Sequence, residues 1–130
     1  MTEVPGFEVV PGEWAIARLP PDAAIPDWAV EASAFSSVTR TASELSIVCP
    51  EARVPEGARA ERGWAVLKLA GPFAFTEVGV LASVLVPLAR AAVSVFAVST
   101  FDTDYVLVPR SALRAAVDAL EAARSGPVTP

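Results

Sequence analysis

The segment from Gly71 to Pro109 reads GPFAFTEVGVLASVLVPLARAAVSVFAVSTFDTDYVLVP, and it carries most of the fold information in the chain. Apolar residues recur at helical spacing in its middle, which predicts one helix over residues 77–91 with a single buried face. Two β-rich stretches, residues 94–100 and 105–108, then flank a short polar turn. That pattern is typical of a hairpin. The segment therefore predicts a helix followed by two antiparallel strands.

Two short motifs occur twice, which indicates an internal repeat. The sequence WAIARL is echoed 50 positions later by WAVLKL, and a second pair of segments is offset by 60 positions. The paired segments are residues 14–19 with 64–69 and residues 38–48 with 98–108. The second alignment sets Glu44 opposite Asp104. Each half is therefore predicted to run strand, helix, strand, turn, strand, with a longer helix in the second half.

This order of elements predicts an α+β fold of the ferredoxin-like βαββαβ type. We expect two tandem halves with a shared or adjoining antiparallel sheet and with helices on one face. The first half is placed at residues 1–60 and the second at residues 61–125. Residues 126–130 are expected to form a disordered tail.

The composition excludes several classes of protein. Hydrophobic residues make up 53% and charged residues 19% of the 130 residues, so a folded core is expected without a metal or another cofactor. Ten basic and fifteen acidic residues give a net charge of -5, which argues against nucleic-acid binding. No apolar run is long enough to span a membrane and no signal peptide is recognisable, so a cytoplasmic protein is expected. The single cysteine, Cys49, is interpreted as a buried structural thiol.

Asp102 and Asp104 at the hairpin turn are the first candidate site residues. They could serve as turn residues, as part of a metal site that would need further oxygen ligands, or as a site for a cationic group. Thr76 to Val80 is expected to form the first turn of the helix, where free N–H groups and the helix dipole favour a carboxylate. Gly79 in this turn permits close approach of a ligand or of another backbone. A carboxylate-binding helix entrance beside an acidic turn suits a zwitterion such as an amino acid.

The motifs GPFAFTEVGVLASVLVPLA and STFDTDYVLV closely resemble those of an ACT-domain subfamily. This subfamily includes small bacterial proteins with two ACT domains and the animal cytosolic arginine sensors. The resemblance covers roughly residues 64–120, and TRTASELSIVCPE resembles the linked N-terminal half more weakly. It implies a non-catalytic regulatory protein that binds an amino acid, arginine or lysine before others, between two ACT domains. It also implies pairing through strands or helices, and a homodimer if the site needs a second pair of domains.

The resemblance also nominates ligand contacts. Glu77 would hold a basic side chain, and Asp104 would hold a positive group of the ligand. The nominated residues are Thr76, Glu77, Val78, Gly79, Val80, Thr100, Phe101 and Asp104, with Ser36, Ser37 and Val38 from the other half.

Two other classes of function remain open. An ACT-fold module that only pairs with another protein would need no ligand. An enzyme is disfavoured, because the chain has no histidine and no phosphate-binding glycine motif.

Overall fold

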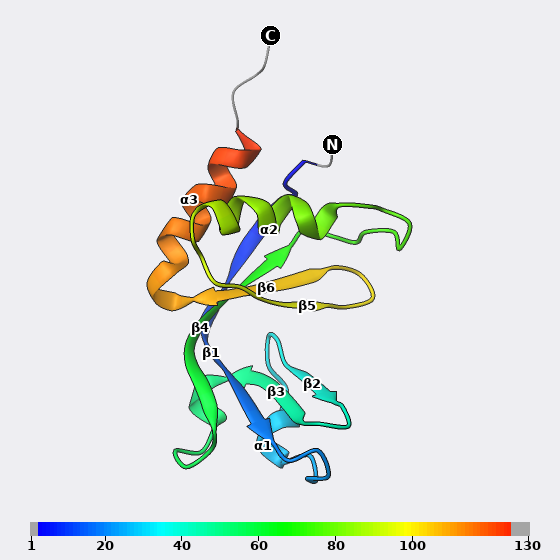
Figure 1. The fold of residues 1–130 in the computed structure, drawn as a ribbon, viewed down its shortest axis with the longest axis vertical. Helices are drawn as coiled ribbons and strands as arrows, with labels where there is room; N and C mark the ends of the chain where they lie inside the picture. The colour runs from blue at the N-terminus through cyan, green and yellow to red at the C-terminus, as the bar shows by residue number, and fades with distance from the viewer. Residues whose placement is uncertain (1–2, 126–130) are drawn as a thin grey trace. The chain divides into compact units, whose positions relative to one another are not determined.

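The computed structural model describes residues 3–125, and the expected tail at 126–130 lies outside them. The chain contains both strands and helices, in an α+β arrangement (Figure 1). The strands are β1 (Phe7–Leu19), β2 (Ser37–Arg40), β3 (Leu45–Pro50), β4 (Ala60–Leu69), β5 (Phe96–Ser99) and β6 (Asp104–Pro109). The helices are α1 (Asp27–Val30), α2 (Val80–Arg90) and α3 (Leu113–Arg124), with short 3-10 helices η1 (Glu51–Arg53) and η2 (Arg110–Ala112).

The chain forms two compact units. The N-terminal unit comprises Val10–Ala65, and the C-terminal unit comprises the described residues through Val9 and from Val66 onward. The strand order is β2-β3-β1-β4 in the N-terminal unit and β1-β4-β6-β5 in the C-terminal unit. Strands β1 and β4 therefore contribute residues to both units.

In each unit one strand comes from the other half of the sequence. In the N-terminal unit the Arg18 N–H donates to the Arg59 carbonyl at 3.0 Å, next to the start of β4. In the C-terminal unit the Ala70 N–H donates to the Gly6 carbonyl at 2.7 Å, just before β1. The first residues of β1 thus form the edge strand next to β4 in the C-terminal unit. Among the described residues, no strand follows α3.

The N-terminal unit is built around the β2–β3 hairpin. Antiparallel pairing sets Val38 opposite Ile47 and Arg40 opposite Leu45. The buried cluster of this unit consists of Ala15, Ala17, Ala29, Leu45, Ile47, Cys49 and Val54. Cys49 is fully buried, as expected of a structural thiol. Desolvation by this burial raises the pKa of the thiol, and the nearby Arg53 charge partly opposes that rise.

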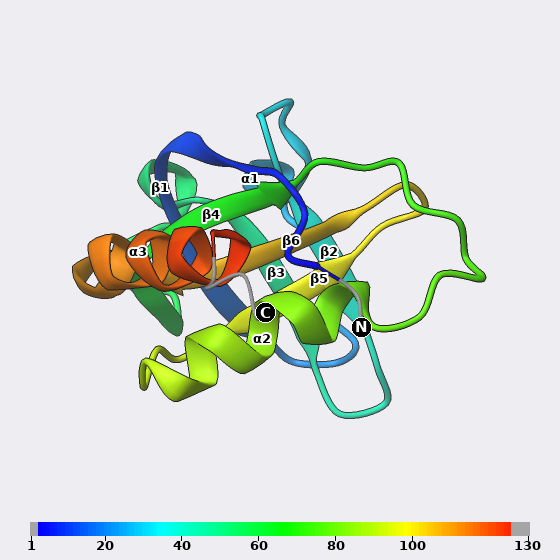
Figure 2. The ribbon, with the colours of Figure 1, turned by 90° about the horizontal axis from the view of Figure 1, so that it is seen from above.

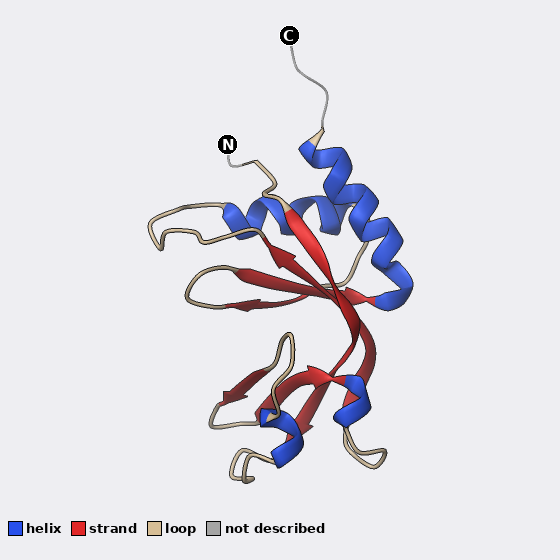
Figure 3. Cartoon of the chain, turned by 180° about the vertical axis from the view of Figure 1, so that it is seen from behind, coloured by secondary structure: helices blue, strands red, loops and turns tan. Residues whose placement is uncertain are grey.

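The C-terminal unit places both of its long helices on one face of its strands (Figures 2 and 3). Helix α2 buries Val80, Val84 and Leu88, which recur every fourth residue and so lie on one side of the helix. Helix α3 buries Ala116 and Leu120, and it also contacts α2. The helical periodicity read from the sequence is therefore confirmed. Among the described residues, no helix combines the length and apolar content required to cross a lipid bilayer.

The two hairpin turns have the same hydrogen bonds, which corrects the repeat alignment. The Thr41 N–H donates to the Glu44 carbonyl at 2.9 Å, and the Thr100 N–H donates to the Thr103 carbonyl at 2.8 Å. Equivalent turn residues are therefore 59 positions apart, and Glu44 corresponds to Thr103 rather than to Asp104. The offset of 60 was wrong by one residue because similar apolar residues on neighbouring positions do not fix a register.

Candidate functional site

The loop after β4 and the β5–β6 turn extend to the same side of the C-terminal unit (Figures 1 and 2). The Phe73 N–H donates to the Asp102 carbonyl at 2.7 Å, and the Thr103 hydroxyl donates to the buried Leu69 carbonyl at 2.9 Å. A Cβ atom on Gly71 would lie 2.7 Å from the Asp102 carbonyl oxygen. The absence of a side chain at Gly71 therefore allows the loop and the turn to approach each other this closely.

A hollow of about 310 Å³ lies between this loop, the start of α2 and the β5–β6 turn, and we call it the turn hollow. Every residue that lines it belongs to the C-terminal unit. The lining residues are Phe73, Ala74, Phe75, Glu77, Gly79, Val80, Leu81, Ser99, Thr100, Phe101, Asp102, Thr103 and Asp104. Glu77, Gly79 and Val80 are thereby brought together with Thr100, Phe101 and Asp104. Thr76 and Val78 are exposed and do not line the hollow.

The expectation that Thr76 to Val80 forms the first turn of the helix is wrong. Helix α2 begins at Val80, and Gly79 precedes it in the left-handed region with φ of 84°. That conformation is accessible to glycine but strained for other residues, so Gly79 stops the helix from extending toward Thr76. The first N–H groups of α2 have no side-chain cap. Because Val80 and Leu81 line the turn hollow, the uncapped helix end is at the hollow.

Glu77 lies in a tight turn outside the helix. Its N–H donates to the Ala74 carbonyl at 2.9 Å, and its Oε1 accepts from the Ala74 N–H at 3.0 Å. The second carboxylate oxygen has no hydrogen bond among the described residues. The side chain is thus oriented by its own turn, with one oxygen left for another donor.

Asp104 is positioned by its neighbour across the hairpin. Ser99 lies directly opposite it in the β5–β6 pairing, and the Ser99 hydroxyl donates to Asp104 Oδ1. Asp104 is half-buried, whereas Asp102 is exposed and holds the loop through its backbone carbonyl. The described residues provide no hydrogen bond to Asp104 Oδ2. Asp104 therefore offers a partly desolvated carboxylate oxygen to the hollow.

The turn hollow has acidic and aromatic character. Glu77, Asp102 and Asp104 line it, and its lining contains no lysine or arginine. Phe75 and Phe101 pack edge to face at its rim with ring centroids 4.9 Å apart, although 76% and 78% of their surfaces are exposed. An acidic hollow with aromatic walls suits an organic cation with an aliphatic stem.

Several lining residues were not anticipated from the sequence. Phe73 and Phe75 come from the loop after β4, Leu81 from the first turn of α2, and Ser99 from the end of β5. Phe73, Phe75 and Ser99 lie at or shortly after the end of a strand in the sequence, and that position was the available signal for them. Leu81 lies near neither strand end. Ser36, Ser37 and Val38, by contrast, belong to the N-terminal unit, where the latter two start strand β2.

Comparison with protein-family models gives two matches. A model described as an ACT domain matches residues 59–122, and a model described as an N-terminal domain matches residues 12–57. Among curated proteins, the human cytosolic arginine sensor for mTORC1 subunit 1 is 33% identical over 64 residues, which are 48% of this chain. The matched segment covers 20% of that sensor, so the chain spans about a fifth of the length of the curated relatives it matches.

Solved structures resemble most of the chain. A protein from Agrobacterium tumefaciens is 41% identical with a TM-score of 0.88, and the match covers 95% of this chain and 91% of that one. The regulatory subunit of aspartate kinase from Thermus thermophilus has a TM-score of 0.63 at 15% identity, with 92% of this chain and 98% of that chain covered. At that identity the second similarity indicates the fold alone.

Proposed function

Because the chain belongs to the ACT-domain proteins, we propose that it is a non-catalytic regulatory protein that binds a free amino acid in the turn hollow. Arginine or lysine is the favoured ligand. The observation that carries this proposal is the convergence of Glu77, Asp104 and the uncapped start of α2 on one hollow. The name of the human relative, a cytosolic arginine sensor, supports the same class of ligand.

The charges of the hollow match both ends of a basic amino acid. The N–H groups of Val80 and Leu81 at the start of α2 are suited to the α-carboxylate. The free oxygens of Glu77 and Asp104 are suited to the side-chain cation and the α-ammonium group. The volume of about 310 Å³ lies at the lower end of the roughly 300–1,000 Å³ typical of ligand pockets, which suits a single amino acid.

We extend the proposal to the architecture of the site. We propose that residues 1–60 and 61–125 are two ACT-like halves, and that Ser36, Ser37 and Val38 contribute ligand contacts when ACT domains pair. A homodimer would supply the second pair of domains. Regulation would follow if the amino acid bound one arrangement of these domains more tightly than another.

Calorimetric titration of the full chain with arginine and lysine tests the proposal. Citrulline and norleucine are the matched controls, because they keep the α-carboxylate and α-ammonium groups but lack the side-chain cation. Each lost charge-assisted hydrogen bond costs about 1.5–3 kcal/mol, so citrulline should bind at least about tenfold more weakly than arginine. A ligand at about 100 times its dissociation constant should also stabilise the protein by about 2.7 kcal/mol.

Variants locate the site. Glu77→Gln and Asp104→Asn should each weaken arginine or lysine binding by at least about tenfold. Asp118→Asn on the exposed side of α3 is the matched control, since within residues 3–125 Asp118 forms one ion pair, with Arg114 at 3.4 Å. Affinity that persists unchanged in Asp104→Asn would contradict the assignment of the turn hollow.

A protein-interaction module without a ligand is the second candidate. It is favoured by the apolar side chains of Phe75, Val78 and Phe101, of which 76–84% of the surface is exposed. Contiguous exposed apolar surface is a feature of protein contacts. This candidate predicts no response to any of the twenty amino acids, together with concentration-dependent association that Phe101→Ser weakens.

A further inference from the structure

Another hollow, of about 390 Å³, lies in the C-terminal unit between the loop after β4 and the β5–β6 turn. We call it the aromatic hollow. Its lining residues are Pro72, Phe73, Ala74, Phe75, Phe101 and Asp102, and all of them except Pro72 also line the turn hollow. Glu77, Asp104 and the start of α2 line the turn hollow but not the aromatic hollow. The aromatic hollow therefore adjoins the turn hollow without the groups assigned there to a free amino acid.

The three most exposed large apolar side chains among the described residues gather on this loop and turn. Phe75, Val78 and Phe101 have 76%, 84% and 78% of their surfaces exposed, whereas the next most exposed, Val30, has 63%. The Phe75 and Phe101 rings contact each other edge to face, with their centroids 4.9 Å apart. Adjoining aromatic rings with this much exposed surface are typical of a place that another molecule covers.

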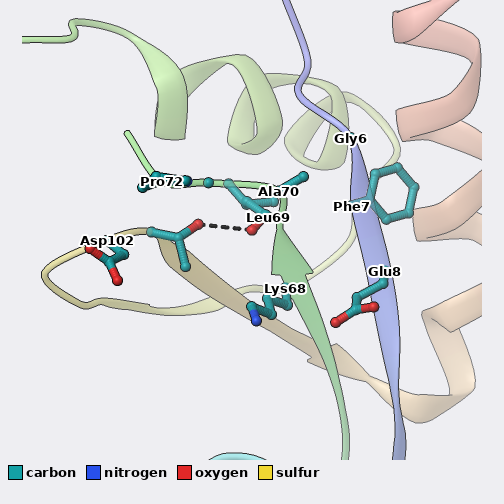
Figure 4. Close-up of a pocket in the computed structure, with 10 residues that line it drawn as sticks. Gly6, Phe7, Glu8, Lys68, Leu69, Ala70, Pro72 and Asp102 are labelled. Atoms are coloured by element: carbon teal, nitrogen blue, oxygen red, sulfur yellow. Dashed lines mark hydrogen bonds between the residues drawn. The ribbon is translucent and has the colours of Figure 1, made fainter. Parts of the chain in front are cut away.

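Hydrogen bonds hold the loop that carries Phe75 against the turn that carries Phe101. The Phe73 N–H donates to the Asp102 carbonyl at 2.7 Å. The hydroxyl of residue 103 donates to the Leu69 carbonyl at 2.9 Å, and this bond is the dashed line in Figure 4. The loop is therefore fastened to the turn on both sides of residue 71. A preformed apolar surface loses little conformational freedom when it binds a partner, which favours affinity.

The ionisable side chains that line the two hollows are all acidic. Asp102 lines both hollows, Glu77 and Asp104 line the turn hollow, and neither lining contains a lysine or an arginine. Figure 4 shows the Lys68 side chain of β4 apart from the Asp102 carboxylate. Among the described residues the Asp102 carboxylate has no hydrogen bond and no ion pair. A cationic group of another molecule would therefore find a carboxylate without a counter-charge beside aromatic rings.

A guanidinium group within a polypeptide fits these features best. Its planar face stacks on an aromatic ring, and its forked N–H groups pair with a carboxylate. Free arginine fits less well, because its α-carboxylate would be repelled by Asp102. The Phe73 and Ala74 N–H groups could not compensate, since they already donate to the Asp102 carbonyl and to Glu77 Oε1. A small molecule is also usually enclosed over roughly 70–90% of its surface, which such exposed rings do not provide.

A second copy of the chain is a poorer partner for this surface. In a two-fold symmetric pair the same surface of each copy meets the other. The carboxylates of Glu77, Asp102 and Asp104 in one copy would then face the same three carboxylates in its partner. The net charge of -5 adds to this repulsion. The charges therefore favour a different protein with a basic segment.

We propose that the aromatic hollow is a docking surface for a segment of another protein that carries an arginine next to an apolar residue. The guanidinium group stacks on Phe75 or Phe101 and pairs with Asp102, and the apolar residue packs on the other ring and on Pro72. This docking does not require an amino acid in the turn hollow, because it uses neither the Glu77 carboxylate nor the start of α2. The two kinds of binding can therefore be measured separately.

Selection from a library of random short peptides on the immobilised full chain tests the chemistry of the partner. The enriched peptides should carry an arginine next to an aliphatic or aromatic residue. Fluorescence anisotropy, without any free amino acid present, then measures the affinity of the most enriched peptide. Replacing its arginine by citrulline keeps the shape and removes the charge, so the affinity should fall at least about tenfold. Absence of enrichment, enrichment without arginine, or equal binding of the citrulline peptide would overturn the proposal.

Variants of exposed residues locate the surface. Asp102→Asn should weaken peptide binding at least about tenfold, and Phe101→Ser about thirtyfold, which is the effect of losing an aromatic anchor. Asp118→Asn on α3 is the matched control for the charge, and Val30→Ser in the N-terminal unit is the matched control for exposed apolar surface. Both controls should leave peptide affinity unchanged. Unchanged affinity in Phe101→Ser would overturn the assignment.

Further comparisons separate this docking surface from other occupants and from the proposed function. Butylguanidine carries the cation without a polypeptide, and an affinity equal to that of the peptide would overturn the assignment to a protein segment. Self-association of the full chain that Phe101→Ser abolishes would assign the surface to a second copy and overturn the proposal. Peptide binding without a calorimetric response to any amino acid would refute the turn-hollow function alone. Amino-acid binding without peptide binding would refute the docking surface alone.

Discussion

Replacing Thr103 by valine should destabilise the protein by about 1 kcal/mol, because the exchange removes one buried hydrogen bond at nearly constant volume. The Thr103 hydroxyl donates to the Leu69 carbonyl at 2.9 Å, and only 8% of Thr103 is exposed. The Leu69 carbonyl also accepts from the Gly71 N–H at 2.9 Å. It would therefore keep one partner in the variant. The cost should be that of one net hydrogen bond rather than that of a fully unsatisfied buried group, which is about 1–3 kcal/mol.

Urea unfolding measures this cost. With a slope of about 2 kcal/mol per molar urea, the midpoint should fall by about 0.5 M while the slope stays constant. Thr76→Val is the matched control, since Thr76 is exposed and has no hydrogen bond from its side chain among the described residues. It should change stability by less than about 0.5 kcal/mol. A Thr103→Val midpoint equal to that of the control would refute the reasoning.

Two further predictions concern the backbone and the buried thiol. Gly71→Ala should destabilise the protein by about 1–3 kcal/mol, because the new Cβ would lie 2.7 Å from the Asp102 carbonyl oxygen. A Cβ added at Gly57 would meet no neighbouring atom within 4 Å, so Gly57→Ala should be nearly neutral in the same urea assay. Equal destabilisation by Gly71→Ala and Gly57→Ala would contradict the close-contact explanation. Burial raises the pKa of the Cys49 thiol above its ordinary value of 9.0, and the nearby Arg53 charge opposes this rise to a smaller extent. The folded state therefore keeps the thiol proton up to a higher pH than the unfolded chain does. The free energy of unfolding should therefore decline as the pH rises above 9.0. Cys49→Ala lacks this thiol, so the difference in unfolding free energy between the protein and the variant should change over the same pH range. A pH-independent difference would rule out this linkage.

The secondary structure was largely predictable because local periodicity reports it directly. The β-rich runs on either side of the polar turn predicted the β5–β6 hairpin, and the apolar stripe predicted α2. On α3, Arg114 and Asp118 stand four residues apart and form an ion pair at 3.4 Å. These features depend on residues within a few positions of one another.

The boundaries and the register were less predictable. Helix α2 begins three residues later than expected, because Gly79 adopts a positive φ that a hydrophobic pattern does not report. The two hairpins differ from the expected alignment by one position for a similar reason. Their register is set by the hydrogen bonds of the turns at Thr41 and Thr100, which depend on backbone geometry.

The sequence by itself determined which segments become strands and helices, and that two acidic residues stand at the start of a buried strand. Only the tertiary structure decided that β1 and β4 each serve both units, and that the loop at Gly71 lies against the turn at Asp102. The physical reason is the range of the interactions. Periodicity is a property of neighbouring residues, whereas strand pairing and the close approach of two backbones join segments about thirty to sixty positions apart, and they exist only once the chain has folded.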